Sequence, residues 1–292
     1  MPGKLIAISD IEGNFGGLYS FLLANKVIDK RCNWIFGKGH LVLNGDFVDR
    51  GKQVTQVLWL IYKLDQQALE SGGKVHYILG NHEIMMLQGN VSYANFKNIE
   101  AAKQISMLAR WDDAMRFVYS KHSALGKWLR TKNIIERVGE IIFVHAGLNI
   151  DYVRNQISVG ELNKIARQHY GIASAEHYDD PNEQLVLSSI TGPYWDRSLA
   201  MDFKHRALYW FNGVDVNETT NASLDSILHY YEASRIVVGH SVVSDIQKDY
   251  SGKVIKIDVK HSEGMRTGFT KGILLQRDTV IKLDDKGQRM AL

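Results

Sequence analysis

Residues 41–51 read LVLNGDFVDRG, a short apolar run that stops abruptly at Asn44. A continuous apolar run, in place of strict alternation, is typical of a strand buried on both faces of a sheet. The residues that follow carry the carboxylates of Asp46 and Asp49 and the guanidinium of Arg50. In open α/β sheets, ligands bind just beyond the carboxyl ends of the strands. The segment therefore predicts a buried strand that ends in a chemically active loop.

The same pattern recurs four times along the chain. The other apolar runs are residues 5–8 before Asp10 and Glu12, residues 75–79 before Asn81 and His82, residues 141–144 before His145, and residues 236–238 before His240. Because the carboxyl ends of parallel strands meet at one edge of a sheet, we expect the five loops to converge on one site. The pattern predicts an α/β fold.

Helical spacing of apolar residues fills the intervals between these runs. Residues 16–27 and 54–68 have the periodicity of amphipathic helices. Two longer stretches, approximately 84–135 and 150–232, are rich in Tyr, Trp, Asn and Lys, and we expect them to be mostly helical insertions that shape access to the site.

Near the C-terminus, residues 254–259 and 272–283 read as β-strands, with turns at 251–252 and 284–287. The chain shows no internal repeat, low-complexity segment or linker, and it holds only 3 prolines. We therefore expect residues 1–292 to form a single domain, with the helical stretches inserted in it.

Composition narrows the class of function. The 292 residues hold 35 Lys and Arg against 32 Asp and Glu, with no basic run of the kind that follows a nucleic-acid backbone. No apolar stretch approaches the roughly 20 residues needed to span a membrane, and the N-terminus lacks the pattern of a signal peptide. Cys32 is the only cysteine, which excludes an intramolecular disulfide. We expect a cytoplasmic protein with no nucleic-acid or membrane partner.

The residues that follow the five runs form a ligand set for metal ions. Carboxylates, imidazoles and an amide oxygen are all suitable, and the candidates are Asp10, Glu12, Asp46, Asn81, His145 and His240. These are too many for one ion. In two-metal hydrolases a shared carboxylate bridges ions about 3.5–4 Å apart, and the pair activates a bridging water as hydroxide for in-line attack on phosphorus. The sequence therefore predicts two divalent metal ions and phosphoester hydrolysis.

Three further side chains suit phosphate chemistry. Arg50 directly follows Asp49, and a guanidinium can grip two phosphate oxygens at once. His82 lies one residue past Asn81, so it can stand beside the metals without binding them. We expect His82 to be the general acid that protonates the leaving alcohol, with Asp49 holding its ring and raising its pKa. The plainer alternative for Arg50 is a structural ion pair with Asp49 or Glu83.

Five motifs of the chain, taken in their order along the sequence, resemble the calcineurin-like metallophosphoesterase signature. They are residues 9–14 (SDIEGN), 45–51 (GDFVDRG), 80–83 (GNHE), 144–147 (VHAG) and 239–240 (GH). The second and third motifs point to the phosphoprotein phosphatase branch. Residues 80–87, 125–130, 192–197 and 237–241 are similar, more narrowly, to the Shewanella-like protein phosphatases, and the similarity runs from about residue 4 to about residue 260.

This resemblance implies a fold and a role for each matched residue. The fold is a central β-sandwich of two mixed sheets flanked by helices, with a helical cap. Asp10 binds the first metal, Asp46 bridges both, and Asn81, His145 and His240 hold the second. The acid dyad is His82 and Asp49, and the substrate-binding residues are Arg50, Arg197 and Asn81. Arg197 rests on the resemblance alone.

One position departs from the family pattern. The first motif usually reads Asp-x-His, whereas this chain has Asp10-Ile11-Glu12. As a ligand, Glu12 adds oxygen and negative charge, which favours harder ions such as manganese, magnesium or ferric iron over zinc. We expect manganese first, with iron, magnesium or zinc as the alternatives. The other interpretations are loss of the first metal, which leaves a pseudo-phosphatase that binds without turnover, or compensation by His261.

The sequence thus predicts a binuclear-metal phosphomonoesterase, and in particular a protein phosphatase. Its substrate is a phosphorylated protein or a small phosphoester, with a dinucleoside polyphosphate as the alternative. Tyr93 and Tyr194 are candidates for lining a substrate groove. The sequence leaves the choice of phosphorylated residue and the oligomeric state open.

Overall fold

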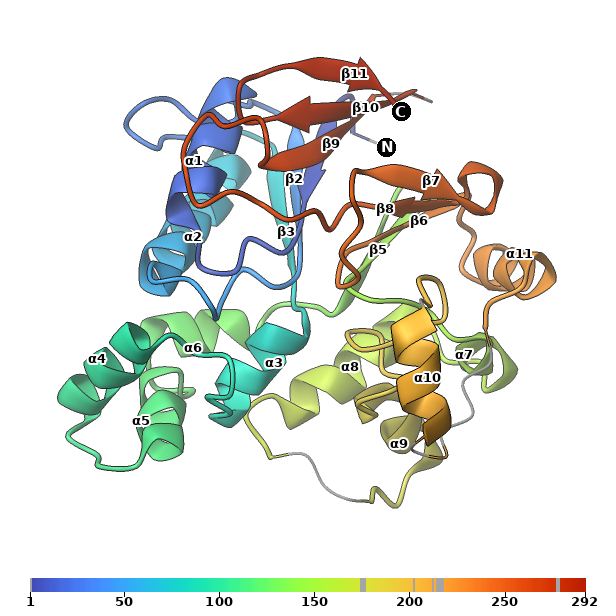
Figure 1. The fold of residues 1–292 in the computed structure, drawn as a ribbon, viewed down its shortest axis with the longest axis horizontal. Helices are drawn as coiled ribbons and strands as arrows, with labels where there is room; N and C mark the ends of the chain where they lie inside the picture. Colours follow the sequence, from blue (N-terminus) through green and yellow to red (C-terminus); the bar gives the residue numbers. More distant parts are fainter. Residues whose placement is uncertain (1, 174–176, 202, 212, 214–217, 277–278) are drawn as a thin grey trace.

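The computed structural model describes residues 2–173, 177–201, 203–211, 213, 218–276 and 279–292. Two mixed β-sheets flanked by helices form its framework (Figure 1), as predicted. The first sheet has the order β11-β10-β9-β1-β2-β3, with bounds β1 (Leu5–Ile8), β2 (His40–Asn44), β3 (Lys74–Ile78), β9 (Lys271–Gln276), β10 (Thr279–Asp284) and β11 (Arg289–Ala291). Strands β1, β2 and β3 are parallel, and the other three are antiparallel to their neighbours.

The second sheet has the order β4-β5-β6-β8-β7. Its bounds are β4 (Ile135–Val138), β5 (Ile141–Val144), β6 (Arg235–Val238), β7 (Gln247–Asp249) and β8 (Val254–Lys256). Strands β5, β6 and β8 are parallel, whereas β4 and β7 pair antiparallel at the two edges. Both sheets therefore place the carboxyl ends of three parallel strands at one edge.

Alternate residues of the central strands face different layers. In β1, Leu5 and Ala7 point into a core shared with Phe143 and Val237 of the second sheet. The other two residues of β1, Ile6 and Ile8, pack in the larger core beneath the helices. This explains why the strand is apolar at every position, because both of its faces are buried.

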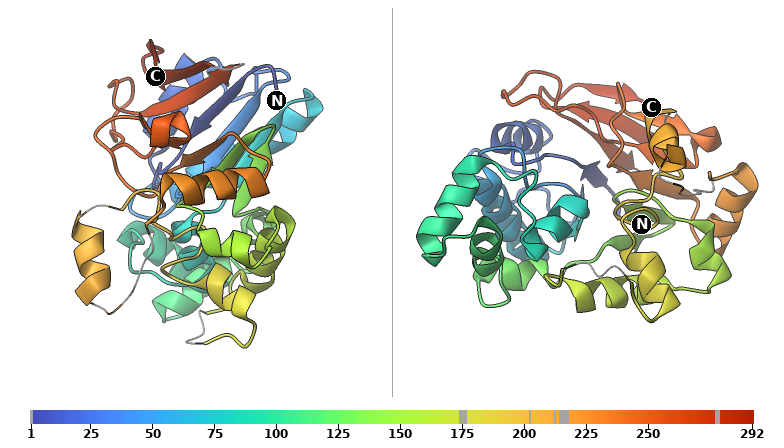
Figure 2. Two further views of the ribbon diagram at one scale, coloured as in Figure 1. Left: turned by 90° about the vertical axis from the view of Figure 1, so that its right-hand side faces the viewer. Right: turned by 60° about the horizontal axis from the view of Figure 1, so that its bottom comes forward.

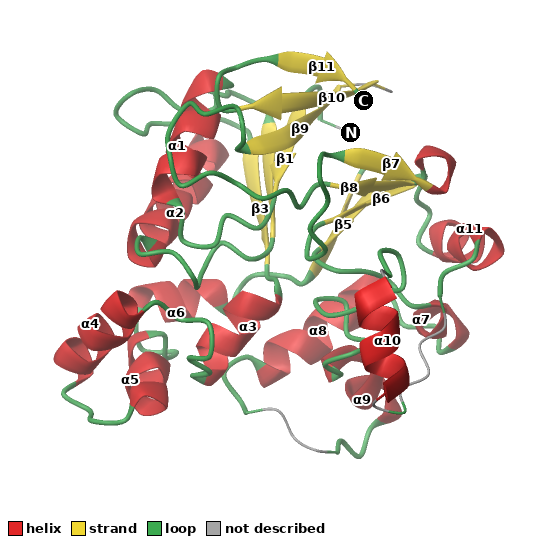
Figure 3. Cartoon of the chain, in the orientation of Figure 1, coloured by secondary structure: helices red, strands yellow, loops and turns green. Residues whose placement is uncertain are grey.

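Helices cover the outer faces of the sheets and one end of the sandwich (Figure 3). Helices α1 (Phe15–Ala24) and α2 (Val54–Glu70) lie against the first sheet, and α7 (Ile150–Arg154) and α11 (Asn221–Tyr230) lie beside the second. The helices at the end of the sandwich are α3 (Asn81–Gln88), α4 (Phe96–Ser106), α5 (Trp111–Val118), α6 (Ala124–Leu129), α8 (Val159–His169), α9 (Pro181–Leu187) and α10 (Phe203–Phe211). Figure 2 shows this helical end from two further directions.

The predicted helical stretches correspond to α3–α6 and α7–α11, apart from the end of the first, where β4 begins at Ile135. Within the second stretch, residues 174–176, 202, 212 and 214–217 lie outside the described residues, as do residues 277–278 of the predicted C-terminal strand region. The predicted strand region, residues 272–283, forms two strands, β9 and β10. The sequence did not predict β4, β7 or β11, and each of these is a short edge strand that includes charged residues. Edge strands are short and only partly buried, so they lack the apolar pattern of central strands.

Candidate metal centre and active site

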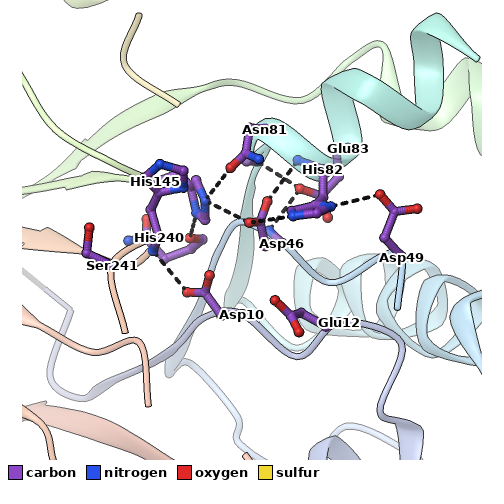
Figure 4. A network of polar contacts seen from close by, with 12 residues as sticks. Asp10, Glu12, Asp46, Asp49, Asn81, His82, Glu83, His145, His240 and Ser241 are labelled. Atoms are coloured by element: carbon purple, nitrogen blue, oxygen red, sulfur yellow. Dashed lines mark hydrogen bonds and ion pairs between the residues drawn. The ribbon is translucent and has the colours of Figure 1, made fainter. Parts of the chain in front are cut away.

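The strand register brings the polar loops to one place. Ile8 of β1 pairs with Leu43 of β2, and Val238 of β6 pairs with Lys256 of β8. Residues that follow these pairs at equal distance lie level with each other at the carboxyl edge of each sheet. Loops that are far apart in the sequence therefore end at one centre between the sheets and the helical end (Figure 4).

Three predicted ligands form a compact cluster. Asp46, His145 and His240 each offer one ligand atom, and these atoms all lie within 4.8 Å of one another. The Nε2 of His145 lies 3.0 Å from Oδ2 of Asp46 and 3.1 Å from Oδ1 of Asn81. Its Nδ1–H donates to the carbonyl of Asn44 at 2.9 Å, so Nε2 is the nitrogen that faces the cluster and would bind an ion. The Oδ2 of Asp10 accepts a hydrogen bond from the backbone N–H of His240 at 3.3 Å.

Close backbone approach at two glycines permits this packing. A Cβ on Gly45 would collide with the ring of His145, and one on Gly80 would collide with the carboxylate of Asp46. Gly45 also has a φ of 87°, in the left-handed region that favours glycine. Any larger residue at either position would displace a ligand of the cluster.

The loops that carry the site residues are strained. Six of those residues are not glycine and yet have positive φ angles between 47° and 64°: Asp10, Glu12, Asp46, Asp49, Arg50 and His240. Such conformations cost of the order of 1 kcal/mol each and persist where the surrounding structure enforces them. The surrounding structure therefore holds these loops in conformations that aim their side chains at one centre.

The donor set fits a divalent cation. Among the described residues, the Nε2 of His240 is buried without a hydrogen-bond partner. Burial, followed by the neighbouring His145, holds the pKa of His240 well below its ordinary value, so the ring is a neutral ligand. Burial and then the charge of Asp258 raise the pKa of Asp10 well above its ordinary value. A cation in this centre would satisfy the lone pair of His240 and offset the crowded carboxylates.

Asp258 is a member of this centre that the sequence did not reveal. It follows β8 at the level at which His240 follows β6, and only 4% of it is exposed. Burial and then repulsion from Asp46, partly offset by His145, raise its pKa to about 7. The sequence pattern placed residue 258 inside a predicted strand, so its position just after the strand, level with the metal ligands, became visible only in the structure.

His82 and Asp49 form a pair beside the cluster. The Nδ1–H of His82 donates to Oδ2 of Asp49 at 2.8 Å, and its Nε2 lies 3.8 Å from Oδ2 of Asp46. Burial by itself lowers the pKa of His82, but the hydrogen bond to Asp49 and the charges of Asp46 and Asp49 outweigh it, and the pKa is raised. The ring of Tyr93 packs edge-on against His82, with centroids 5.0 Å apart. A ring that is held by a carboxylate and stays protonated can donate a proton.

Arg50 pairs with Glu12 and not, as the alternative from the sequence suggested, with Asp49 or Glu83. Its guanidinium also lies over the ring of Tyr93, 5.2 Å from the centroid. The buried carboxylate of Glu83 instead accepts from the backbone N–H groups of Asp46, Phe47 and Gly80 and from the hydroxyl of Tyr77. Glu83 therefore fixes the loop that presents Asp46.

Arg197 and His261 also border the centre. The Nη1 of Arg197 donates to Oγ of Ser241 at 2.7 Å and lies 3.5 Å from the carbonyl of His240. Arg197, which only the resemblance suggested, thus lies beside the metal cluster. The Nε2–H of His261 donates to the carbonyl of Ser9 at 2.9 Å, and its Nδ1 accepts from the N–H of Lys271 at 3.4 Å. Both nitrogens of His261 are occupied, so this arrangement offers no compensating ligand.

A groove of about 620 Å³ opens beside the centre, between α3 on one side and α8 and α9 on the other. Tyr93 and Tyr194, the two tyrosines singled out from the sequence, both line it.

No helix in the described part of the chain combines the length and the apolar character needed to cross a membrane.

Comparison with known proteins agrees with this geometry. The family model for calcineurin-like phosphoesterases matches residues 3–244. Shewanella-like protein phosphatase 1 of Plasmodium berghei (strain Anka) is 29% identical over 240 residues, which cover 82% of this chain and 61% of the relative. Shewanella-like protein phosphatase 2 of Arabidopsis thaliana is 23% identical over 329 residues, which cover 97% of this chain and 77% of that protein. The chain therefore spans less than two thirds of the Plasmodium relative.

Among solved structures, the chain is similar to the cold-active protein-tyrosine phosphatase of a psychrophilic Shewanella species. The two share 28% sequence identity and superpose with a TM-score of 0.84, over 100% of this chain and 81% of the other. The likeness covers both sheets and the helical end.

Proposed function

The chain belongs to the calcineurin-like phosphoesterase family, and from this premise we propose that it is a metal-dependent phosphatase that hydrolyses phosphate monoesters on protein side chains. The observation that carries the proposal is the His82–Asp49 pair at 2.8 Å beside the cluster of Asp46, His145 and His240. A cluster of metal ligands next to a general acid can supply both the activated water and the proton that the hydrolysis of a phosphate monoester uses.

We propose two divalent ions, with manganese first. Asp10, Glu12 and Asp46 would hold one of them, and Asp46, Asn81, His145 and His240 the other. Glu12 has two carboxylate oxygens, so it can contact an ion with one and Arg50 with the other. When bound, such ions supply Lewis-acid polarisation of the phosphoryl oxygens and lower the pKa of water.

The chain's own residues orient the ester and move a proton. Arg50 and Arg197 lie on either side of the cluster and would bind phosphate oxygens, which offsets the charge that grows on them. The Nε2–H of His82 would donate to the leaving oxygen as the ester bond breaks. Asp49 holds the opposite nitrogen and keeps the ring protonated until then.

The character of the groove favours a protein substrate over a dinucleoside polyphosphate. A polyphosphate carries several negative charges and needs cations along its path. Among the described residues, those that line the groove include no lysine and no arginine. Beyond Arg50 and Arg197 at the centre, such a substrate would find no compensating charge in this groove.

We further propose phosphotyrosine as the preferred phosphorylated residue. Tyr93 stands at the mouth of the groove beside His82, with 48% of its surface exposed. A phenyl leaving group can pack against this ring while His82 faces its ester oxygen. The similar Shewanella protein is described as a tyrosine phosphatase, which supports the proposal. We expect the enzyme to act in the cytoplasm, whose reducing conditions suit a chain with a single cysteine.

A comparison of three substrates tests the proposal. The manganese-loaded enzyme is assayed with a phosphotyrosine peptide, the matched phosphoserine peptide and a dinucleoside tetraphosphate. We expect the highest kcat/KM for the phosphotyrosine peptide and the lowest for the dinucleotide. Faster cleavage of the dinucleotide would contradict the proposed function and would indicate a small-metabolite hydrolase.

A further inference from the structure

The chemistry of the centre does not use the groove between α3 and the α8–α9 pair. We propose that it binds the polypeptide segment next to the phosphorylated residue and selects uncharged side chains there. The inference rests on the proposed function, and it adds the sequence preference of the substrate.

The groove is continuous with the reaction centre. Tyr93 lines the groove and packs against the ring of His82, with centroids 5.0 Å apart. Trp195 lines it as well and packs edge-on against the ring of His240 at 5.8 Å. A phosphorylated side chain that reaches the metal cluster must therefore bring its neighbouring residues to the mouth of the groove.

Apolar and aromatic side chains close the bottom of the groove, but they are nearly buried, and polar atoms make up most of its accessible surface. Ile84 and Met85 of α3 are 5% and 7% exposed, and Tyr170 and Tyr194 on the opposite wall are 6% and 4% exposed. Its volume of about 620 Å³ lies within the roughly 300–1,000 Å³ of ligand-binding clefts. A short peptide segment fits this space better than a flat protein surface does.

The rim of the groove carries neutral hydrogen-bonding groups. Asn90, Ser92, Gln184 and Ser189 are exposed along it, and their amides and hydroxyls can pair with the peptide groups of an extended segment. Such pairing adds binding affinity that does not depend on the charge of the substrate's side chains.

The neutral character of its described lining gives the groove its selectivity. The lining residues that the structure describes include no Asp, Glu, Lys or Arg, and the histidine among them, His169, lies with its Nε2 3.7 Å from a carboxylate oxygen of Glu183. A charged substrate residue would lose part of its hydration on entering the groove and would find no opposite charge among the lining residues that the structure describes. Uncharged residues bear no such cost.

A peptide panel tests this selectivity in the wild-type enzyme. Phosphopeptides with one fixed phosphorylated residue carry either Ala, Gln and Tyr or Glu and Lys at the positions on both of its sides. We expect kcat/KM to fall about tenfold for the charged set, while hydrolysis of para-nitrophenyl phosphate sets the baseline. Equal rates for the two sets would overturn the inference.

A designed change of preference gives a readout that misfolding cannot mimic. Ser189→Lys adds a positive charge on the rim, and we expect kcat/KM for the acidic peptides to rise about two- to fivefold relative to the uncharged ones. The matched control is Ser226→Lys on α11, an exposed serine outside the groove, which should change neither peptide class. No gain in Ser189→Lys, or the same gain in Ser226→Lys, would contradict the assignment.

The groove assignment and the phosphatase function can be disproved separately. If wild-type enzyme cleaves para-nitrophenyl phosphate but treats all peptides alike, the groove assignment is wrong and the phosphatase function stands. If the metal-loaded enzyme cleaves neither the aryl phosphate nor any peptide, the proposed function itself fails.

Discussion

The Oδ2 of Asp49 lies 2.8 Å from Nδ1 of His82, and the other nitrogen of the same ring faces Asp46 at 3.8 Å. One carboxylate thus holds the imidazole from behind, while the metal cluster lies in front of it. This order of groups separates a proton donor from the metal ligands, although His82 directly follows the ligand candidate Asn81 in the sequence. This arrangement determines what substitutions of His82 and Asp49 should do.

Replacement of His82 by Asn should remove the proton donor and leave the metal ligands in place. We expect kcat for a phosphoserine peptide to fall by about 10²–10⁴. The loss should be smaller for para-nitrophenyl phosphate, because its leaving group departs without a proton. Steady-state kinetics with both substrates, together with metal analysis of the variant, checks this. His122→Asn, at an exposed histidine, is the control, and an equal loss for both leaving groups would contradict the role.

Asp49→Asn should act through His82. Asp49 touches the ring and not the ester, so it is a positioning residue, and its removal should lower kcat by a similar pattern across leaving groups. In a His82→Asn background, the same change should cost little more, because residues that act as a unit are not additive. A double-mutant cycle on kcat measures this. Additive losses would mean that Asp49 acts independently of His82.

A second, structural histidine pair predicts a pH dependence of stability. The Nδ1 of His76 lies 2.5 Å from Oε2 of Glu136, and Asn133 donates to the other oxygen at 3.0 Å. Burial raises the pKa of Glu136, but His76 and Lys74 outweigh it, so its pKa is lower than the ordinary 4.5. A lowered pKa means that the carboxylate stabilises the fold above pH 4.5 and that this contribution is lost as the pH falls through the folded value.

Glu136→Gln should therefore lower the free energy of unfolding by about 1–3 kcal/mol at pH 7. The difference from wild type should shrink as the pH falls below 4.5. Urea unfolding of both proteins across this range is the measurement. A difference that stays constant down to the lowest pH would show that the charge of Glu136 makes no contribution.

Glu12 is the position at which the chain departs from its family, and its carboxylate contacts Arg50. If Glu12 is a ligand, Glu12→Ala should reduce the bound manganese from two ions to one. Arg50→Ala is the matched control, because it breaks the same ion pair; it should keep both ions and raise KM. Metal content after equilibrium dialysis distinguishes the two. Two ions in Glu12→Ala would show that Glu12 serves only to hold Arg50.

Much of this architecture could be predicted from local sequence. Central strands such as β1 and β5 are buried on both faces, so their sequences are continuously apolar, and the reactive residues follow directly at their ends. The edge strands β4 and β7 could not be predicted, because a polar sequence such as that of Gln247–Asp249 forms a strand only through its neighbour.

The site divides in the same way. Asp46, His145 and His240 stand in short motifs and were predicted, and the structure brings them together. Asp258 has no motif, and its place beside Asp10 results from the register of β6 and β8. The contact of Glu12 with Arg50 depends on side-chain directions in two strained loops, which residue types and spacing do not specify.

Metal reconstitution shows whether the chain binds two ions and hydrolyses phosphate esters with them. The protein is stripped of metal, titrated with manganese, and assayed for hydrolysis of para-nitrophenyl phosphate at each step. The account predicts that two ions bind per chain and that hydrolysis appears with them, whereas His240→Gln loses one ion and the activity. Full occupancy by manganese without hydrolysis, or hydrolysis that does not depend on metal, would contradict the account.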